Sequence, residues 1–177
     1  MRVVASVNGP AGASAPTKRP QSVTPEGKAV APVIDGVRVR PAITHPDKRG
    51  TVCEIFSQDW DDQPLVHVYE ITIRPGVVKG WVKHELQDDR LFMASGSLRV
   101  VLYDDREESP TRGLVTEQCF DEHSRALLQI PAGVWHAVEN VGVSDAQMIN
   151  CPTRAYDHEA PDKWDLPLDT ELIPFSF

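Results

Sequence analysis

The sequence predicts an all-β domain built as a sandwich or a barrel. From residue 33 onward, short runs rich in β-branched and aromatic residues recur about every ten residues, with turn-forming residues between them. Several runs alternate between apolar and polar residues, most clearly residues 66–73, as expected for strands that bury one face. The chain of 177 residues is long enough for one domain with a substantial core.

The runs in the first half of this region end at residues that favour turns. Residues 37–40 and 51–56 carry Val, Ile and Phe among polar residues. The longer run at 65–73 is followed by Arg74-Pro75-Gly76, in which Pro fixes φ and Gly accepts a left-handed turn conformation. We expect strands at residues 37–40, 51–56, 65–73 and 76–82.

The second half continues in the same way. Ser95-Gly96 precedes the next apolar run, and Asp104-Asp105 and Ser109-Pro110 follow it. Pro131-Ala132-Gly133 separates the last two runs. We expect strands at residues 98–103, 114–120, 126–130 and 134–140.

Both ends of the chain differ in composition from this region. Residues 1–32 are rich in Pro, Ala, Gly, Ser and Thr, so they bury too little apolar surface to offset their ordering entropy. We therefore expect a flexible N-terminal arm at 1–32, with an unprocessed leader as the alternative, and a barrel domain at 33–177. The Pro-rich tail at 156–177 is expected to pack back across the domain as a short C-terminal extension.

Composition and charge exclude several classes of function. There are 26 acidic and 18 basic residues, a net charge of −8, which argues against a nucleic-acid partner or an anionic membrane surface. No stretch of about eighteen apolar residues occurs, and the N-terminus lacks the apolar centre of a secretory signal. The three cysteines are far apart and in no metal-ligand spacing, as in a reduced protein. The expected location is cytoplasmic.

Two stretches place histidines where chemistry is possible. Residues 131–140 have the pattern PxGxxHxxxN, in which a tight turn enters a strand whose alternation directs His136 into the barrel. Upstream, His84 is followed by Asp89 and Gly96. The two stretches resemble the conserved motifs of the cupin superfamily, which implies a double-stranded β-helix, or jelly-roll barrel. A complete first motif holds His at 82 and 84 and Glu at 89, whereas this chain has Val82, His84 and Asp89.

Three interpretations of His84, Asp89 and His136 remain open. Two imidazoles and a carboxylate on a rigid scaffold can hold a divalent metal with open coordination positions. Without a metal, the histidines can serve as catalytic base and acid near neutral pH, and Asp89 can orient His84. In the third interpretation the histidines only stabilise the end of the barrel by hydrogen bonds. Trp81 and Trp135 are most simply core anchors, with a stacking wall for a sugar or base as the alternative.

Three further segments resemble the dTDP-4-dehydrorhamnose 3,5-epimerase family, and the resemblance as a whole runs from about residue 33 to residue 174. Residues 47–56 resemble its DxRGxFxExF signature, residues 104–113 its DxRxxSPTxG segment, and residues 130–137 its IPxGxxHG segment. The resemblance implies a cupin-type homodimer that exchanges a strand and binds a nucleotide-linked sugar. It nominates Arg49 and Glu54 as nucleotide contacts, and a guanidinium is well suited to a diphosphate. A salt bridge between Arg49 and Glu54 is the alternative.

The catalytic residues of that family are not carried over. Its catalytic base lies at the position of Val82, its supporting Asp falls beyond Phe177, and its opposing Tyr should fall near residues 148–150, where none occurs. The chain therefore resembles a divergent member that lacks the family's His, Asp and Tyr. The new His84 and Asp89 stand where the family has Gln and Lys, a change that suits either a relocated base or a metal.

Three functions compete on these observations. The first, which we favour, is an isomerase or epimerase of carbohydrate metabolism that acts on a keto sugar by proton transfer, with His84 and His136 as base and acid. The second is a divalent-metal-dependent lyase, isomerase or oxygenase for a small metabolite, with His84, Asp89 and His136 as metal ligands. The third is a non-catalytic binding protein on the same scaffold.

Overall fold

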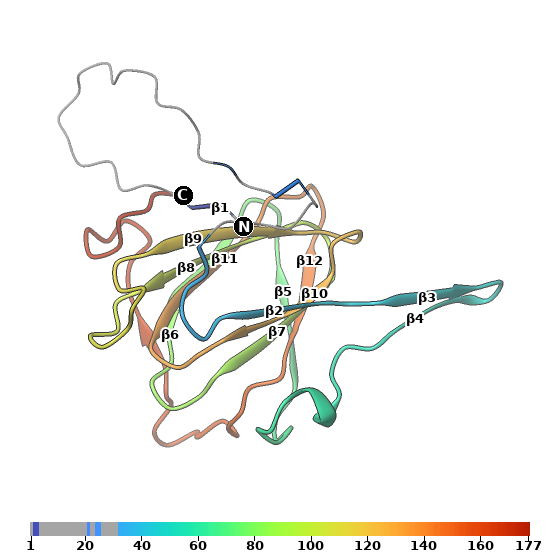
Figure 1. The fold of residues 1–177 in the computed structure, drawn as a ribbon, viewed down its shortest axis with the longest axis horizontal. Coiled ribbons are helices and arrows are strands. Elements are labelled where there is room, and N and C mark those ends of the chain that lie inside the picture. Colours follow the sequence, from blue (N-terminus) through green and yellow to red (C-terminus); the bar gives the residue numbers. More distant parts are fainter. Residues whose placement is uncertain (1, 4–20, 22–23, 26–31) are drawn as a thin grey trace, which may run out of the picture.

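The computed structural model describes residues 2–3, 21, 24–25 and 32–177. Two antiparallel sheets lie face to face and close into a jelly-roll barrel (Figure 1). The six-stranded sheet has the order β1-β9-β8-β11-β6-β13, and the five-stranded sheet has the order β2-β10-β7-β12-β5. From β5 onward the chain crosses from one sheet to the other after nearly every strand, so residues distant in the sequence face one another. The all-β jelly-roll prediction is confirmed.

The strand bounds are as follows. The six-stranded sheet contains β1 (Arg2–Val3), β6 (Val78–Lys83), β8 (Leu98–Asp104), β9 (Val115–Phe120), β11 (Val134–Asn140) and β13 (Trp164–Asp165). The five-stranded sheet contains β2 (Arg38–Pro41), β5 (Tyr69–Ile73), β7 (Asp89–Ser95), β10 (Ala126–Ile130) and β12 (Ala146–Asn150). A separate hairpin is formed by β3 (Thr44–Asp47) and β4 (Gly50–Cys53), and the short 3₁₀ helix η1 (Gln58–Trp60) follows it.

The main core fills the space between the two sheets. It contains apolar side chains from both, among them Leu91, Leu128 and Val138, each with about 1–2% of its surface exposed. A second apolar cluster lies on the outer face of the six-stranded sheet, where Trp81 packs edge-on against Phe175 of the C-terminal tail. The tail therefore packs back on the barrel as expected, and β13 pairs with β6.

Two central strands were not predicted. Five successive residues of β7, Asp89–Met93, are buried, so the strand shows no polar–apolar alternation to mark it. A strand that is covered on both faces has buried residues at successive positions. Its sequence therefore lacks the two-residue period that distinguishes a strand from other buried segments. The strand β12 (Ala146–Asn150) was also missed. The strand expected at residues 65–73 is shortened to β5, and the one expected at 51–56 is β4 at residues 50–53.

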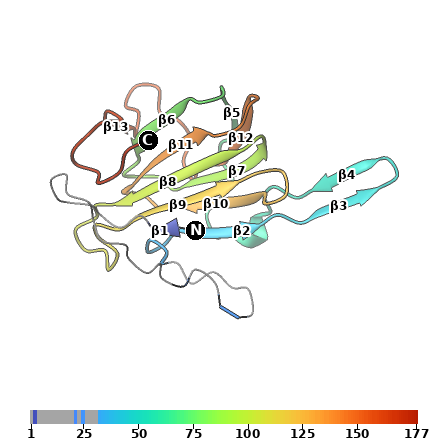
Figure 2. The same cartoon turned by 90° about the horizontal axis from the view of Figure 1, so that it is seen from above.

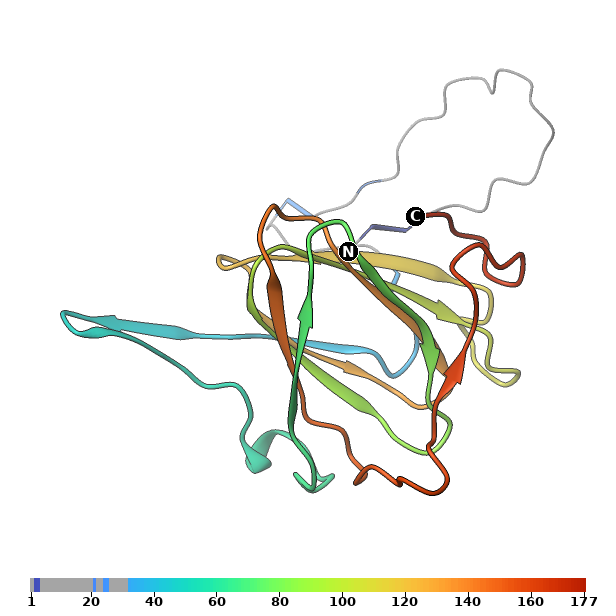
Figure 3. The same cartoon turned by 180° about the vertical axis from the view of Figure 1, so that it is seen from behind.

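The hairpin β3–β4 extends away from the barrel, as Figures 2 and 3 show. Arg49 lies at its turn, where its guanidinium bonds Asp47 at 2.5 Å and remains largely exposed. Arg49 thus pairs with Asp47, and not with Glu54 as the alternative interpretation of the sequence expected. Most of the expected N-terminal arm lies outside the described residues, so that prediction stays open. Within the described ranges, no helix has the length and apolar character needed to cross a membrane.

The SPT segment forms a closed turn between β8 and β9. The buried Asp104 carboxylate accepts bonds from Arg106 Nε at 2.8 Å, Ser109 Oγ at 2.6 Å and Thr111 Oγ1 at 2.7 Å. Burial raises the pKa of Asp104, but these bonds outweigh burial and bring the pKa to about 2. The motif thus has a structural explanation, because it fixes the connection between two strands of the six-stranded sheet.

A buried arginine joins β7 to two loop segments beside the five-stranded sheet. Arg90, about 1% exposed, contacts the Asp61 carboxylate at 3.1 Å. Its guanidinium also donates to the carbonyl oxygens of Gln63, Pro64, Cys151 and Pro152. These bonds attach β7 to the loop before β5 and to the chain after β12.

Candidate functional site at the barrel mouth

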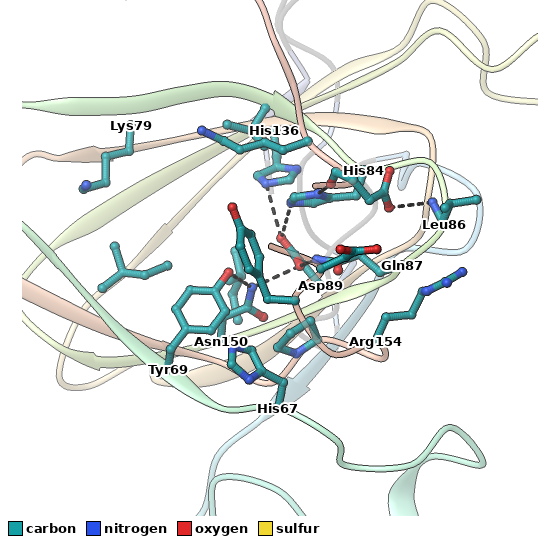
Figure 4. A pocket seen from close by; sticks show the side chains of 18 of the residues that line it. His67, Tyr69, Lys79, His84, Leu86, Gln87, Asp89, His136, Asn150 and Arg154 are labelled. Carbon is teal, nitrogen blue, oxygen red and sulfur yellow. Dashed lines mark hydrogen bonds and ion pairs between the residues drawn. The ribbon is translucent and has the colours of Figure 1, made fainter. Parts of the chain in front are cut away.

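A cavity of about 420 Å³ opens between the two sheets. The six-stranded sheet contributes Val82 and His136, the five-stranded sheet contributes Tyr69 and Asp89, and the segment at 154–165 forms one side. Figure 4 shows His84, His136 and Asp89 converging at its inner wall. Such a volume is typical of small-molecule sites.

His84 is held by the loop that follows β6. Its Nδ1 bonds the backbone oxygen of Asp162, whose carboxylate accepts the N–H groups of Glu85 at 2.9 Å and Leu86 at 2.8 Å. The His84 carbonyl in turn accepts the N–H of Gly133 at 2.6 Å. Because a carbonyl only accepts, Nδ1 carries a hydrogen and Nε2 faces the cavity. Asp162 thus orients the ring, a role that the sequence did not reveal.

His136 reaches the same point from β11. Its Nε2 lies 3.4 Å from Asp89 Oδ2, the same distance as from His84 Nε2 to that oxygen. The two imidazole rings are 5.7 Å apart, centre to centre. His136 pairs in register with Val82 of β6, so the position of the family's base lies directly beside it. The expected convergence of His84, Asp89 and His136 is therefore present in the structure.

Asp89 is the buried acceptor between the two histidines. Its Oδ1 accepts bonds from Gln87 Nε2 and Asn150 Nδ2, each at 3.0 Å, and its Oδ2 faces both imidazoles. Burial raises the pKa of Asp89, but the bond from His84 and the charges of both histidines outweigh burial and bring the pKa to about 2. The carboxylate is therefore ionised at neutral pH.

The pKa values of the two histidines shift in opposite directions. Burial lowers the pKa of His84, but its hydrogen bond and charge interaction with Asp89 outweigh burial, so the pKa is raised overall. Burial dominates at His136 and lowers its pKa, with Asp89 acting in the opposite sense. Groups whose neighbours separate their pKa values in this way can share one proton as an acid–base pair.

The same three residues also fit a metal ion. One ligand atom from each of His84, Asp89 and His136 lies within 4.8 Å of the other two. The bond from His84 Nδ1 to the Asp162 carbonyl is the kind of outer contact that orients a metal-ligating histidine. The geometry therefore suits proton transfer and metal binding alike.

Other predicted site residues lie elsewhere. Trp81 is fully buried beneath the C-terminal tail, and Trp135 donates its Nε1–H to Asp105 at 2.8 Å; neither lines the cavity. The stacking wall expected as an alternative is therefore absent from the described cavity. Glu54 and Arg49 lie toward the hairpin, also outside the cavity lining. Their nomination as nucleotide contacts stays a prediction.

The structure adds residues that the sequence did not suggest. Tyr69 and Asn150 face each other across β5 and β12, and Asn150 Nδ2 donates to the Tyr69 hydroxyl oxygen at 2.9 Å. Three basic residues also line the cavity: Lys79, Arg154 and Lys163. The sequence signal that could have indicated Asn150 is a polar residue directly after the apolar pair Met148-Ile149.

Comparisons with known proteins agree on one family. No family model matches the sequence. Over 142 residues the chain is 38% identical to Agl13 of Haloferax volcanii, named a probable low-salt glycan biosynthesis epimerase, covering 78% of this chain and 90% of that protein. It is 36% identical over 148 residues to SpsL of Bacillus subtilis, a spore coat polysaccharide biosynthesis protein, covering 82% of this chain and 97% of that one.

Solved structures show the same fold. A dTDP sugar isomerase from Desulfovibrio desulfuricans superposes with a TM-score of 0.76 at 27% identity, covering 82% of this chain and 94% of that one. The rmlC epimerase of Mycobacterium tuberculosis gives 0.68 at 20% identity, covering 79% and 72%, a likeness of fold alone. Together with the two curated relatives and the three motifs in family order, these matches establish that the chain belongs to the dTDP-4-dehydrorhamnose 3,5-epimerase family.

Proposed function

We propose that the chain is an epimerase or isomerase of nucleotide-linked keto sugars that moves a proton at a carbon next to the ketone. The observation that carries the proposal is the pair His84 and His136, both facing the Asp89 carboxylate at 3.4 Å inside one cavity. Removing such a proton requires a base within hydrogen-bond reach of the carbon and an acid near the ketone oxygen. Two imidazoles with opposite pKa shifts supply both groups.

Asp89 acts on this pair through charge. When one imidazole accepts the proton of the sugar, the ionised carboxylate stabilises the resulting imidazolium. The negative charge then moves onto the ketone oxygen as an enolate, which the second imidazole can hydrogen-bond. The family's base position is occupied by Val82, which pairs with His136 in the same cavity wall. His136 can therefore supply a base close to the position where the family has one.

The cavity also suits a nucleotide diphosphate. Lys79, Arg154 and Lys163 line this opening together with the carboxylates of Asp89, Asp157, Asp162 and Asp165. Lys163 Nζ pairs with Asp165 Oδ1 at 3.1 Å. Of the three basic side chains, we propose that Lys79 and Arg154 contact the phosphate groups. Among fold relatives, ChmJ of Streptomyces bikiniensis is a 3′-monoepimerase solved with dTDP and with dTDP-quinovose. We therefore propose a dTDP-linked keto sugar as the substrate class; the homodimer implied by the resemblance remains a prediction.

Deuterium exchange tests the proposed function. In D₂O, the purified protein is expected to introduce deuterium at the carbons beside the ketone of dTDP-4-keto-6-deoxyglucose, as followed by NMR. His84→Gln and His136→Gln are each expected to slow exchange by about 10²–10⁴-fold. His158→Gln, which changes a histidine outside the cavity lining, should exchange at the wild-type rate. Absence of exchange in the wild type would contradict the proposal.

A divalent metal is the second candidate, favoured by the close approach of ligand atoms from His84, Asp89 and His136. It predicts about one metal ion per chain in protein purified without chelator, measured by elemental analysis. The metal should be lost in His84→Ala and in His136→Ala, and removing it with a chelator should abolish exchange. Metal-free protein that exchanges at the full rate would exclude this candidate.

A further inference from the structure

We propose that Gln87 determines which sugar the site accepts, because its amide oxygen accepts a hydrogen bond from a hydroxyl group of the substrate. The cavity then selects a keto sugar that carries a hydroxyl near the ketone over the deoxy analogue that lacks it. This inference rests on the proposed function and specifies its substrate. Gln87 is half-buried, lines the cavity and lies beside Asp89 in Figure 4.

The amide of Gln87 has one orientation in the cavity. Its Nε2 donates to Asp89 Oδ1 at 3.0 Å. Because the pKa of Asp89 is about 2, this carboxylate is ionised at neutral pH and only accepts hydrogen bonds. The amide nitrogen of Gln87 must therefore face Asp89, and the amide oxygen Oε1 is directed away from it.

This amide oxygen receives no hydrogen bond from the protein. Among the described residues, no donor to Gln87 Oε1 is seen, whereas Nε2 of the same amide is bonded. An amide oxygen has two lone pairs that can accept hydrogen bonds, so the ligand group that binds it must carry an O–H or N–H hydrogen. A sugar hydroxyl meets this requirement, whereas the oxygens of an ionised phosphate only accept.

The backbone is held in place on both sides of Gln87. The N–H of Leu86 donates to the Asp162 carboxylate at 2.8 Å, and the N–H of Asp88 donates to Thr153 Oγ1 at 2.9 Å. Both bonds attach the loop that contains Gln87 to the chain that follows β12. A side chain presented from a fixed backbone loses little freedom on binding, which favours discrimination between similar ligands.

A single carboxylate connects Gln87 with the two imidazoles. Asp89 Oδ1 accepts the bond from Gln87, and Oδ2 lies 3.4 Å from Nε2 of both His84 and His136. A sugar with a C–H group at one imidazole therefore has its neighbouring carbons near the Gln87 amide. In dTDP-4-keto-6-deoxyglucose the available donors are the hydroxyls at C2 and C3, because C4 is the ketone and C6 carries no hydroxyl. A bond from one of them helps to fix the C–H group toward the histidines.

Deoxy analogues of the sugar test this role. Deuterium exchange in D₂O is measured as kcat/KM for dTDP-4-keto-6-deoxyglucose and for its 2-deoxy and 3-deoxy analogues, which all keep hydrogens beside the ketone. The wild type is expected to discriminate against one of the two analogues by about 10–100-fold, because that analogue leaves the amide oxygen unpaired. Gln87→Met keeps the length of the side chain but lacks the amide, so its discrimination should fall to about threefold or less.

The ratio between two substrates separates this role from an effect through Asp89. Gln87→Met also removes the bond to Asp89, but that loss lowers exchange of all three sugars by the same factor. Because the ratio is measured in one preparation, it does not depend on the folded fraction. Gln147→Met is the matched control, since Gln147 is exposed on β12 and lies outside the cavity lining; it should keep the wild-type rates and discrimination.

Different results would overturn different conclusions. A wild type that exchanges both analogues as well as the parent sugar would overturn the role of Gln87 and leave the proposed function standing. Wild-type discrimination retained in Gln87→Met would do the same, because the hydroxyl would then be recognised elsewhere. A wild type that exchanges none of the three sugars would overturn the proposed function itself.

Discussion

Asp89→Asn is expected to lower kcat by about 10²–10⁴-fold with a much smaller change in KM. The substitution keeps the size of the side chain, and its amide oxygen can still accept the bonds from Gln87 and Asn150. The amide nitrogen would then face the two imidazoles and donate to Nε2, occupying the lone pair that must accept the substrate's proton. It also removes the negative charge that stabilises the imidazolium.

Steady-state kinetics of epimerisation and of deuterium exchange would measure this loss. Because the charge acts when the proton is transferred, both rates should fall together. Asp145→Asn changes an exposed carboxylate to the same amide and should retain wild-type kinetics. A variant at Asp89 with the wild-type kcat would show that the carboxylate is only structural.

The convergence of His84, Asp89 and His136 was predictable because it depends on motif spacing within single strands. Turn residues fix where a strand begins, and strict alternation then decides which side chains face inward. The same alternation explains the location of the tryptophans. Trp81 and Trp135 are neighbours of cavity residues Val82 and His136 along their strands, so they point to the opposite face, into the outer cluster. The sequence already contained this information.

Tyr69 and Asn150 could not be predicted in the same way. Their contact depends on the pairing of β5 with β12, and β12 was not recognised as a strand. Pairing register is set by the whole sheet and does not follow from local pattern. The sequence comparison looked for the family's tyrosine at residues 148–150, where none occurs. The strand beside them supplies a tyrosine that lies directly opposite Asn150.

Replacement of Arg90 by Met is expected to lower the free energy of unfolding by about 3–5 kcal/mol. Methionine fills a similar volume but donates no hydrogen bonds. The Asp61 carboxylate, 6% exposed, would lose its 3.1 Å partner, and four backbone carbonyls would lose a donor. A buried charge left without its partner costs far more than the intact pair contributes. Arg90→Lys should rescue little, because an ammonium cannot reproduce the planar set of five donors.

Urea unfolding followed by fluorescence measures this loss, with Arg38→Met on the exposed face of β2 expected within about 0.5 kcal/mol of wild type. An unchanged midpoint in Arg90→Met would contradict the prediction. The effect should extend to the site, since Arg90 follows Asp89 and its backbone N–H bonds Asn150. Its guanidinium also fixes the loop that leads into Tyr69. The folded fraction of Arg90→Met should therefore show slower deuterium exchange than wild type, because Arg90 supports Asn150, which bonds Asp89.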